Sequence, residues 1–202
     1  MAKVSKSKTA VKDVSAGVSV DASELLIGDR TTVTGYHSQE YRSAELTQPI
    51  KCFDKKAWLG VGYYFWIEVI YAHYWGEDKK SSGKTQSYDI YRAGLKIENC
   101  LNTVFNEEHY LFFKEMIKEA IMYFKNMREP VNLELVNRYL NDKVWTKHGI
   151  EGIIFDDKPT NPKNKTRIYS EIPDLYYDKR IQIVIFDMKN INNFELYLED
   201  QQ

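Results

Sequence analysis

Runs of hydrophobic residues along the chain predict four β-strands. Residues 31–36 are rich in β-branched side chains, and residues 88–97 alternate between hydrophobic and polar positions. Residues 150–155 and 181–186 are short apolar runs, which are typical of buried strands. After the first strand, the turn at residues 58–62 contains two glycines and leads into a further buried segment, so we expect functional residues there.

Apolar residues spaced three and four apart predict three helices. The first covers residues 67–75, and a polar loop follows it at residues 79–84. The helix at residues 107–126 is the clearest, because acidic residues lie in its first turn and apolar residues form one stripe. Pro130 and Asn132 mark the start of the third helix. Strands thus precede and follow a block of helices, which favours an α+β fold.

Composition divides the chain into two parts. Residues 1–30 are mostly small, polar or charged, which predicts a flexible N-terminal tail. The chain has 202 residues, of which 43% are hydrophobic and 14% aromatic, enough for one domain with a hydrophobic core. We therefore expect one folded domain over residues 31–202.

Charge and cysteine content limit the surroundings of the protein. Lys and Arg number 28 against 29 Asp and Glu, so no overall field attracts nucleic acid or an acidic membrane. Cys52 and Cys100 are too few for a disulfide framework, and no apolar run is typical of a membrane span or a secretory signal. We expect a cytoplasmic protein that does not contact membranes.

Three common catalytic motifs are missing from the sequence. It contains no G-x-x-x-x-G-K-[ST] phosphate loop, no G-x-S-x-G elbow and no H-E-x-x-H pair. Its four histidines are dispersed, so we expect no metal site.

Three segments, taken in order, resemble the motifs of a known family. Gly35-Tyr36-His37-Ser38 closes the first strand, residues 58–66 contain a Gly-x-Gly-x-Tyr-Phe sequence, and Gln182 stands at the head of the last predicted strand. Together they resemble the diphtheria-toxin and poly(ADP-ribose)-polymerase branch of the ADP-ribosyltransferases, in particular small bacterial and phage-defence members. The resemblance covers about residues 34–191.

This resemblance implies both a fold and a reaction. The fold would be a split β-sheet core, flanked by helices, with a NAD cleft between two small sheets. Residues 31–202 would form the catalytic domain of an enzyme that takes NAD⁺ as its substrate, releases nicotinamide and transfers ADP-ribose to a macromolecule.

The first segment would bind the nicotinamide half of NAD⁺. By resemblance, His37 would hydrogen-bond a hydroxyl of the nicotinamide ribose, which a neutral imidazole can do. The backbone at Ser38 would bind the nicotinamide carboxamide. The alternative is that His37 is an ordinary interior histidine at a strand end.

The resemblance also assigns aromatic residues to the nicotinamide ring. Tyr64 would stack on this ring, and Gly62 would let the backbone approach it closely. Tyr71 and Trp75, on the following helix, would close the other side of the ring. Simple core packing is the alternative for these aromatic residues.

Gln182 departs from the family pattern. The late strand usually begins with a Glu that binds the ribose 2′-hydroxyl and stabilises the cation that forms as nicotinamide leaves. A neutral amide still binds the hydroxyl but supplies no charge. Glu171, in the preceding loop, is the candidate for the missing carboxylate, and a solvated loop residue is the alternative. Since chain elongation in the family depends on that Glu, we expect transfer of single ADP-ribose units.

Acceptor recognition is assigned to the segment before the late strand. Four cations lie within residues 158–167, and Tyr176, Tyr177, Lys179 and Arg180 follow. Cations among aromatic residues bind phosphates and stack on bases, which favours RNA or DNA over protein as the acceptor. A solvated loop is the alternative. Bacterial members of the family often act as toxins or anti-phage effectors, with or without an antitoxin protein, so an antitoxin is a further candidate partner.

Other functions stay open at this point. A NAD glycohydrolase would use the same site with water as the acceptor. A binding module with the same fold would have lost catalysis together with its Glu. An RNA 2′-phosphotransferase is disfavoured, because the basic residues of its phosphate pocket have no counterparts in this sequence.

Overall fold

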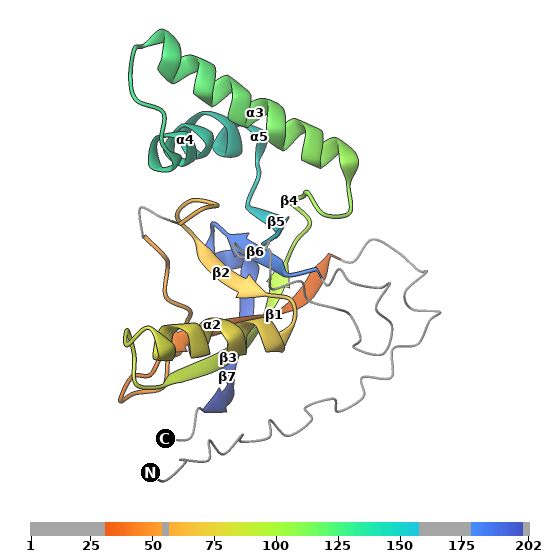
Figure 1. Cartoon of the computed structure of the whole chain (residues 1–202). Coiled ribbons are helices and arrows are strands. Elements are labelled where there is room, and N and C mark those ends of the chain that lie inside the picture. The colour runs from red at the N-terminus through yellow and green to blue at the C-terminus, as the bar shows by residue number, and fades with distance from the viewer. Residues whose placement is uncertain (1–30, 54–56, 158–178, 200–202) are drawn as a thin grey trace, which may run out of the picture.

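A seven-stranded mixed sheet is the centre of the computed structural model, which describes residues 31–53, 57–157 and 179–199 (Figure 1). Its order is β4-β5-β6-β2-β1-β3-β7; β4 and β5 pair in parallel, and the other neighbours are antiparallel. The strands are β1 (Thr32–Glu40), β2 (Tyr63–Trp66), β3 (Tyr88–Lys96), β4 (Cys100–Asn102), β5 (Gly152–Asp156), β6 (Ile181–Ile185) and β7 (Ile191–Glu199). The predicted tail, the basic segment at 158–167 and Glu171 lie outside the described residues.

Three helical segments accompany the sheet in the described ranges, so the α+β class is confirmed. They are α2 (Val69–Ser81), α3 (Glu107–Asn126) and α4 (Leu133–Tyr139), which continues through the π-helical η1 (Leu140–Trp145) into α5 (Thr146–His148). A 3-10 turn, η2 (Met188–Asn190), precedes β7. The Asn132 side chain accepts a hydrogen bond from the Leu135 amide, so it caps α4 at the predicted start.

Helix α2 is longer than its apolar pattern predicts. It includes residues 79–81, which the polar composition assigns to a loop. Contacts across successive turns support these polar residues: the Lys79 ammonium lies 4.6 Å from the centre of the Trp75 ring, and Lys80 lies 3.9 Å from Glu77. The strand β7 is absent from the sequence prediction.

The short link between β3 and β4 requires the sheet to curl. Four other strands separate β3 from β4 in the sheet, which is about 24 Å if the sheet is flat. The chain from Lys96 to Cys100 spans at most about 15 Å. A hydrogen bond of 3.0 Å from the Cys100 amide to the Ile97 carbonyl shortens it further. The two ends of the sheet therefore turn towards each other.

Hydrophobic residues form three clusters around the curled sheet. One lies against α3, α4 and η1 and includes Phe113, Val136, Trp145, Ile153 and Val184. Another lies against α2 and includes Trp66, Tyr71, Tyr88 and Ile90. The third joins both ends of the sheet, because it contains Cys100 of β4 and has Ile191 and Phe194 of β7 packed against it. Figure 1 shows α2 packed beside β1 and β3, and α3 with α4 beyond the β4 edge.

Candidate functional site

The boundary between β1 and β2 differs from the other strand boundaries. Among the described residues, β1 pairs with β2 only through Tyr36 and Trp66, whereas it pairs with β3 along all nine of its residues. Directly after Tyr36, the Nδ1 atom of His37 lies 2.8 Å from the backbone oxygen of Tyr64 in β2. A side chain therefore links the two strands where their backbone pairing ends. We call this place the β1–β2 seam.

His37 is buried and neutral in this position. Its side chain is 7% exposed and lies near the rings of Phe65 and Phe194. Burial lowers the pKa of His37 below its ordinary value of 6.5, although the hydrogen bond to the Tyr64 carbonyl and the nearby Gln39 side chain oppose part of the shift. Because a carbonyl oxygen only accepts, Nδ1 carries the proton and Nε2 presents a lone pair.

Two buried polar atoms at the seam have no partner among the described residues. Neither Nε2 of His37 nor Oγ of Ser38 has a hydrogen-bond partner within the described ranges. Buried polar atoms normally have one, and a missing partner costs about 1–3 kcal/mol. The seam can therefore accept a hydrogen bond from a hydroxyl group through His37 and exchange another with Ser38.

Tyr64 is held rigidly by the turn that precedes β2. Its hydroxyl donates to the Gly60 carbonyl at 2.6 Å and accepts from the Leu59 amide at 3.1 Å. Desolvation raises the pKa of Tyr64 well above its ordinary value, so the hydroxyl stays protonated. At Gly62, a Cβ atom would lie only 2.4 Å from Cγ2 of Val184, so the close approach is to strand β6.

Gln182 lies on β6, directly opposite Trp66 of β2. It is 7% exposed, and its Oε1 accepts a hydrogen bond of 2.9 Å from the indole nitrogen of Trp58. This bond fixes the orientation of the amide. Sequence reasoning placed Trp58 only at the start of the glycine turn and not in the site. A buried tryptophan usually needs a hydrogen-bond partner for its indole N–H, and this requirement is the signal that could have identified it.

An arginine–aspartate pair lies next to Gln182. Nη2 of Arg180 is 3.2 Å from Oδ2 of Asp157, and the guanidinium lies 5.4 Å from the Trp66 ring centre and 5.5 Å from that of Tyr71. Desolvation raises the pKa of Asp157, and Arg180 opposes part of this shift. Sequence reasoning missed Asp157, although a polar residue directly after a buried strand is a usable signal.

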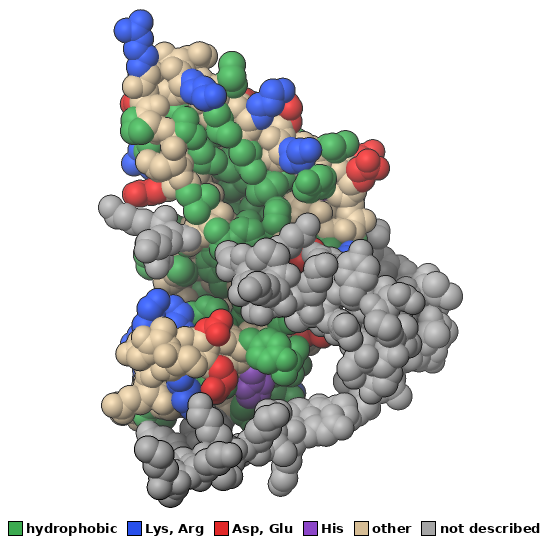
Figure 2. Space-filling view, in the orientation of Figure 1, with side chains coloured by type: hydrophobic (Ala, Val, Ile, Leu, Met, Phe, Trp, Pro, Cys, Tyr) green, Lys and Arg blue, Asp and Glu red, His purple; other side chains and the backbone are tan. Residues whose placement is uncertain are grey.

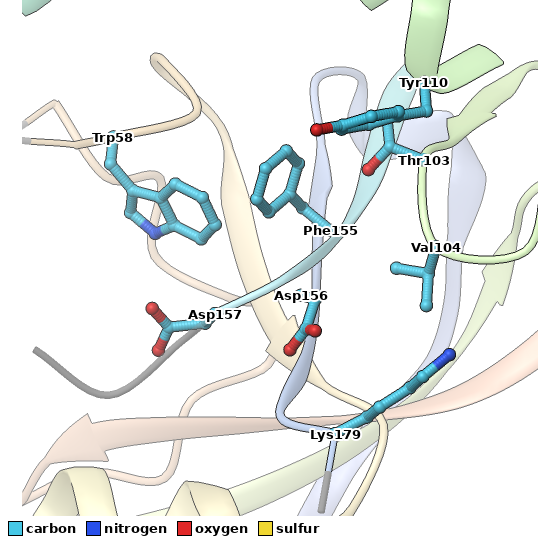
Figure 3. A pocket seen from close by; sticks show the side chains of 8 residues that line it. All are labelled: Trp58, Thr103, Val104, Tyr110, Phe155, Asp156, Asp157 and Lys179. Atoms are coloured by element: carbon cyan, nitrogen blue, oxygen red, sulfur yellow. The ribbon is translucent and has the colours of Figure 1, made fainter. Parts of the chain in front are cut away.

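A cavity of about 510 Å³ opens beside these residues (Figure 3). It is lined by Trp58, Thr103, Val104, Tyr110, Phe155, Asp156, Asp157 and Lys179. The rings of Trp58 and Phe155 meet edge to face, with centres 5.0 Å apart. Because Trp58 also bonds Gln182, the cavity and Gln182 share one wall.

The structure places the predicted residues His37, Tyr64 and Gln182 on adjacent strands, β1, β2 and β6. Their side chains are not in mutual contact: His37 lies against Phe65, whereas Gln182 lies against Trp58. On α2, Trp75 is half-buried and Tyr71 is 1% exposed.

Comparisons with protein-family models, curated proteins and solved structures found no match. Over the described ranges, no group of three or more His, Cys, Asp and Glu side chains is arranged to hold a metal ion. Likewise, none of the helices in the described part of the chain is long and apolar enough to cross a membrane.

Proposed function

We propose that the chain is a NAD⁺-dependent mono-ADP-ribosyltransferase, which releases nicotinamide and transfers ADP-ribose to a macromolecule. The observation that carries this proposal is the β1–β2 seam. There the His37 Nε2 and Ser38 Oγ atoms are buried and lack partners in the described part of the chain. A ribose hydroxyl would satisfy His37 Nε2, so binding would remove the desolvation penalty of that atom, and Ser38 Oγ, on the opposite face of β1, would need a different partner.

The seam also supports the fold of the family. The described strands form one sheet rather than the two small sheets that the resemblance implies, but the single residue pair between β1 and β2 in the described ranges separates β4-β5-β6-β2 from β1-β3-β7 at the seam. An ADP-ribosyltransferase has its NAD cleft between two small sheets, and we propose that these two groups of strands correspond to them. Because β1 leaves β2 after Tyr36, a ligand at the seam can reach His37. Gln182 lies in one row with Trp66 and Tyr36, on the opposite face of the strands, so the proposal requires the ligand to pass between β1 and β2.

The chemistry of the site suits a dissociative reaction. Neutral His37 accepts a ribose hydroxyl, the backbone at Ser38 binds the carboxamide, and Tyr64 offers a fixed ring for nicotinamide to stack on. Of the two rings on α2, we assign Trp75 to close the site, because Tyr71 is fully packed. Gln182 binds the ribose without a charge, so the enzyme gains mainly from positioning. Glu171 stays a prediction.

A catalytically inactive NAD-binding module is the second candidate function. The observation that favours it is Gln182, whose amide is engaged by Trp58 and supplies no negative charge to the departing nicotinamide. A NAD glycohydrolase would use the same residues with water as the acceptor.

The test is nicotinamide release from labelled NAD⁺, with and without RNA, DNA or cell extract. We expect label on a macromolecule, a loss of about 100-fold in His37→Ala and Tyr64→Ala, and faster release in Gln182→Glu. Thr34→Ala, an exposed position on the same strand as His37, is the matched control.

Each other outcome selects a different function. Release of nicotinamide with no labelled macromolecule would favour the glycohydrolase. Binding of NAD⁺ without release, in every mixture, would favour the binding module. Equal release by wild type and His37→Ala would refute the proposed site.

A further inference from the structure

We propose that the cavity in Figure 3 binds an amino-bearing nucleobase of a nucleic-acid acceptor, and that Asp157 takes the proton from its amino group. This inference rests on the proposed transferase function and adds the acceptor to it. We call the cavity the acceptor cavity.

The position of the acceptor cavity is the first argument. Phe155, in its wall, is the β5 residue opposite Gln182 on β6, and Trp58, in the same wall, bonds the Gln182 side chain. Asp157 follows two residues after Phe155, and its amide bonds the Arg180 carbonyl at 2.8 Å. Phe155 and Asp157 therefore border the residue that would hold the ribose, so a group in the cavity lies next to the carbon under attack.

The walls of the cavity suit a flat ring. Trp58, Phe155 and Tyr110 come from three separate segments, and Figure 3 shows all three rings directed into the cavity. Tyr110, near the start of α3, is 41% exposed and stands at the mouth. Aromatic side chains hold unpaired bases by stacking, whatever the sequence around them.

The polar side chains of the cavity suit hydrogen-bond donors. Asp156 and Asp157 lie together on one side of the cavity (Figure 3), and their carboxylates accept from the amino groups of bases but repel phosphate. A thymine or uracil ring has no amino group to offer. Burial raises the pKa of Asp157, which suits a carboxylate that receives a proton, and the ion pair with Arg180 opposes part of this rise.

Cations at the mouth favour a nucleic acid over a protein acceptor. The Lys179 ammonium lies 4.7 Å from the Phe105 ring centre, and that of Lys114 lies 5.4 Å from the Tyr110 ring centre. Both lysines are exposed. Figure 2 shows basic and acidic side chains together over α3, because its further lysines alternate with glutamates, and Lys118 pairs with Glu115. The attraction for phosphate is therefore confined to Lys179 and Lys114. They attract the phosphates on either side of a bound base and repel an arginine or lysine side chain.

The transfer step balances without another reactant. The amino nitrogen uses its lone pair to bond the anomeric carbon as the bond from that carbon to nicotinamide breaks. The electron pair of the broken bond leaves with nicotinamide, whose positive charge it neutralises. The surplus proton on the amino nitrogen passes to the Asp157 carboxylate and then to water.

The experiment compares single-stranded oligonucleotides with amino-bearing bases against oligothymidine, each with labelled NAD⁺ and full-length protein. We expect label on the amino-bearing strands alone. Tyr110→Ala should lower this transfer at least tenfold and weaken oligonucleotide binding measured by fluorescence anisotropy. Nicotinamide release without oligonucleotide should stay unchanged. Leu111→Ala, an exposed neighbour on α3 outside the cavity lining, is the control.

Asp157 is tested separately from the cavity. Asp157→Asn should lower transfer at least tenfold while oligonucleotide binding stays within twofold of wild type, and Asp157→Glu should restore part of the transfer. Loss of binding in Asp157→Asn would show a structural role instead. Circular dichroism checks that the variants fold, and Tyr110→Ala tests the cavity even if Asp157→Asn does not.

Failure of this inference can be told apart from failure of the proposed function. Two results would refute the acceptor cavity without refuting the transferase chemistry. One is release of nicotinamide with no labelled strand, and the other is equal labelling of strands by Tyr110→Ala and wild type. Preferential labelling of an arginine-rich peptide would also overturn it. If no mixture releases nicotinamide, the proposed function fails, and a Tyr110-dependent loss of oligonucleotide binding still decides whether the cavity holds a base.

Discussion

Strand β1 has two neighbours in the sheet, and it meets them in different ways. It pairs with β3 along its whole length, but among the described residues only Tyr36 pairs with β2. On the β3 side, backbone groups satisfy one another and residues such as Ile90 and Leu95 are fully buried. On the β2 side, the His37 side chain donates a hydrogen bond to the backbone oxygen of Tyr64.

This difference shows how one strand can serve stability and binding together. The β1–β3 ladder holds β1 in place without any ligand, so the seam can keep buried polar atoms that a fully paired strand would not have. Binding sites are most precise when rigid elements carry them, and β1 is such an element. We therefore expect changes on the β3 side to affect folding and changes at the seam to affect binding.

The largest expected effect comes from a larger side chain at Gly35 of β1, which lies close to both β3 and β2. A Cβ atom on Gly35 would lie 2.5 Å from Cδ1 of Leu95 in β3 and 2.9 Å from Cβ of Phe65 in β2. We expect Gly35→Val to lower the free energy of unfolding by about 2–3 kcal/mol, measured by urea denaturation. Thr34→Val, an exposed neighbour, should change it by less than about 0.5 kcal/mol. Equal midpoints for the two variants would contradict the packing described.

Hydrogen exchange should resolve the two sides of β1 residue by residue. Successive amides of a strand point to opposite neighbours, so those facing β3 should exchange slowly and those facing β2 beyond Tyr36 should exchange faster, by at least about tenfold. NMR-detected exchange measures this difference, and saturating NAD⁺ should reduce it. Uniform protection along β1 without ligand would show that the seam is closed.

The pH dependence of stability should reveal the buried imidazole. Burial lowers the pKa of His37 below 6.5, so between its folded pKa and 6.5 the unfolded chain binds more protons than the folded chain. The histidine therefore destabilises the fold progressively as the pH falls below 6.5. We expect His37→Gln to lose part of this dependence in urea titrations from pH 7.5 to 5. Identical profiles for both proteins would show that His37 is not held neutral.

The smallest expected effect is at Ser38. Removing a buried hydroxyl that has no partner in the described ranges removes a desolvation penalty, so Ser38→Ala should be neutral or stabilising by up to about 1 kcal/mol. Thr103→Val is the comparison, because it keeps the volume but loses a bond of 2.8 Å to the Ile154 carbonyl. It should cost about 1 kcal/mol. A destabilised Ser38→Ala would mean that this hydroxyl is bonded in the folded protein.

Local signals account for what the sequence predicts well. The stripe and the acidic first turn place α3 at residues 107–126, and the structure confirms these bounds. Strand β7 was missed, although Phe194, Leu196 and Leu198 alternate with polar residues. The apolar positions change phase between Ile191 and Phe194, where the register with β3 also shifts, so the alternation covers only the second half of the strand.

The candidate site likewise contains residues that the sequence predicts and residues that it does not. Motif order suffices to propose His37, Tyr64 and Gln182, because each stands in its own recognisable segment. The Trp58–Gln182 bond and the Arg180–Asp157 pair join residues that only the strand order brings together. Hydrophobic periodicity carries no information on strand order, so these partners needed the structure.

The inner position of β6 in the sheet has a consequence for folding. It lies between β5 and β2, and its pairing with β2 joins Gln182 to Trp66 across more than a hundred residues of sequence. Such contacts of high contact order slow folding, because the chain must close a long loop before they form. During synthesis, the two strands cannot meet until β6 has left the ribosome. The proposed site therefore assembles only after β6 has been synthesised, and activity should not appear before that point.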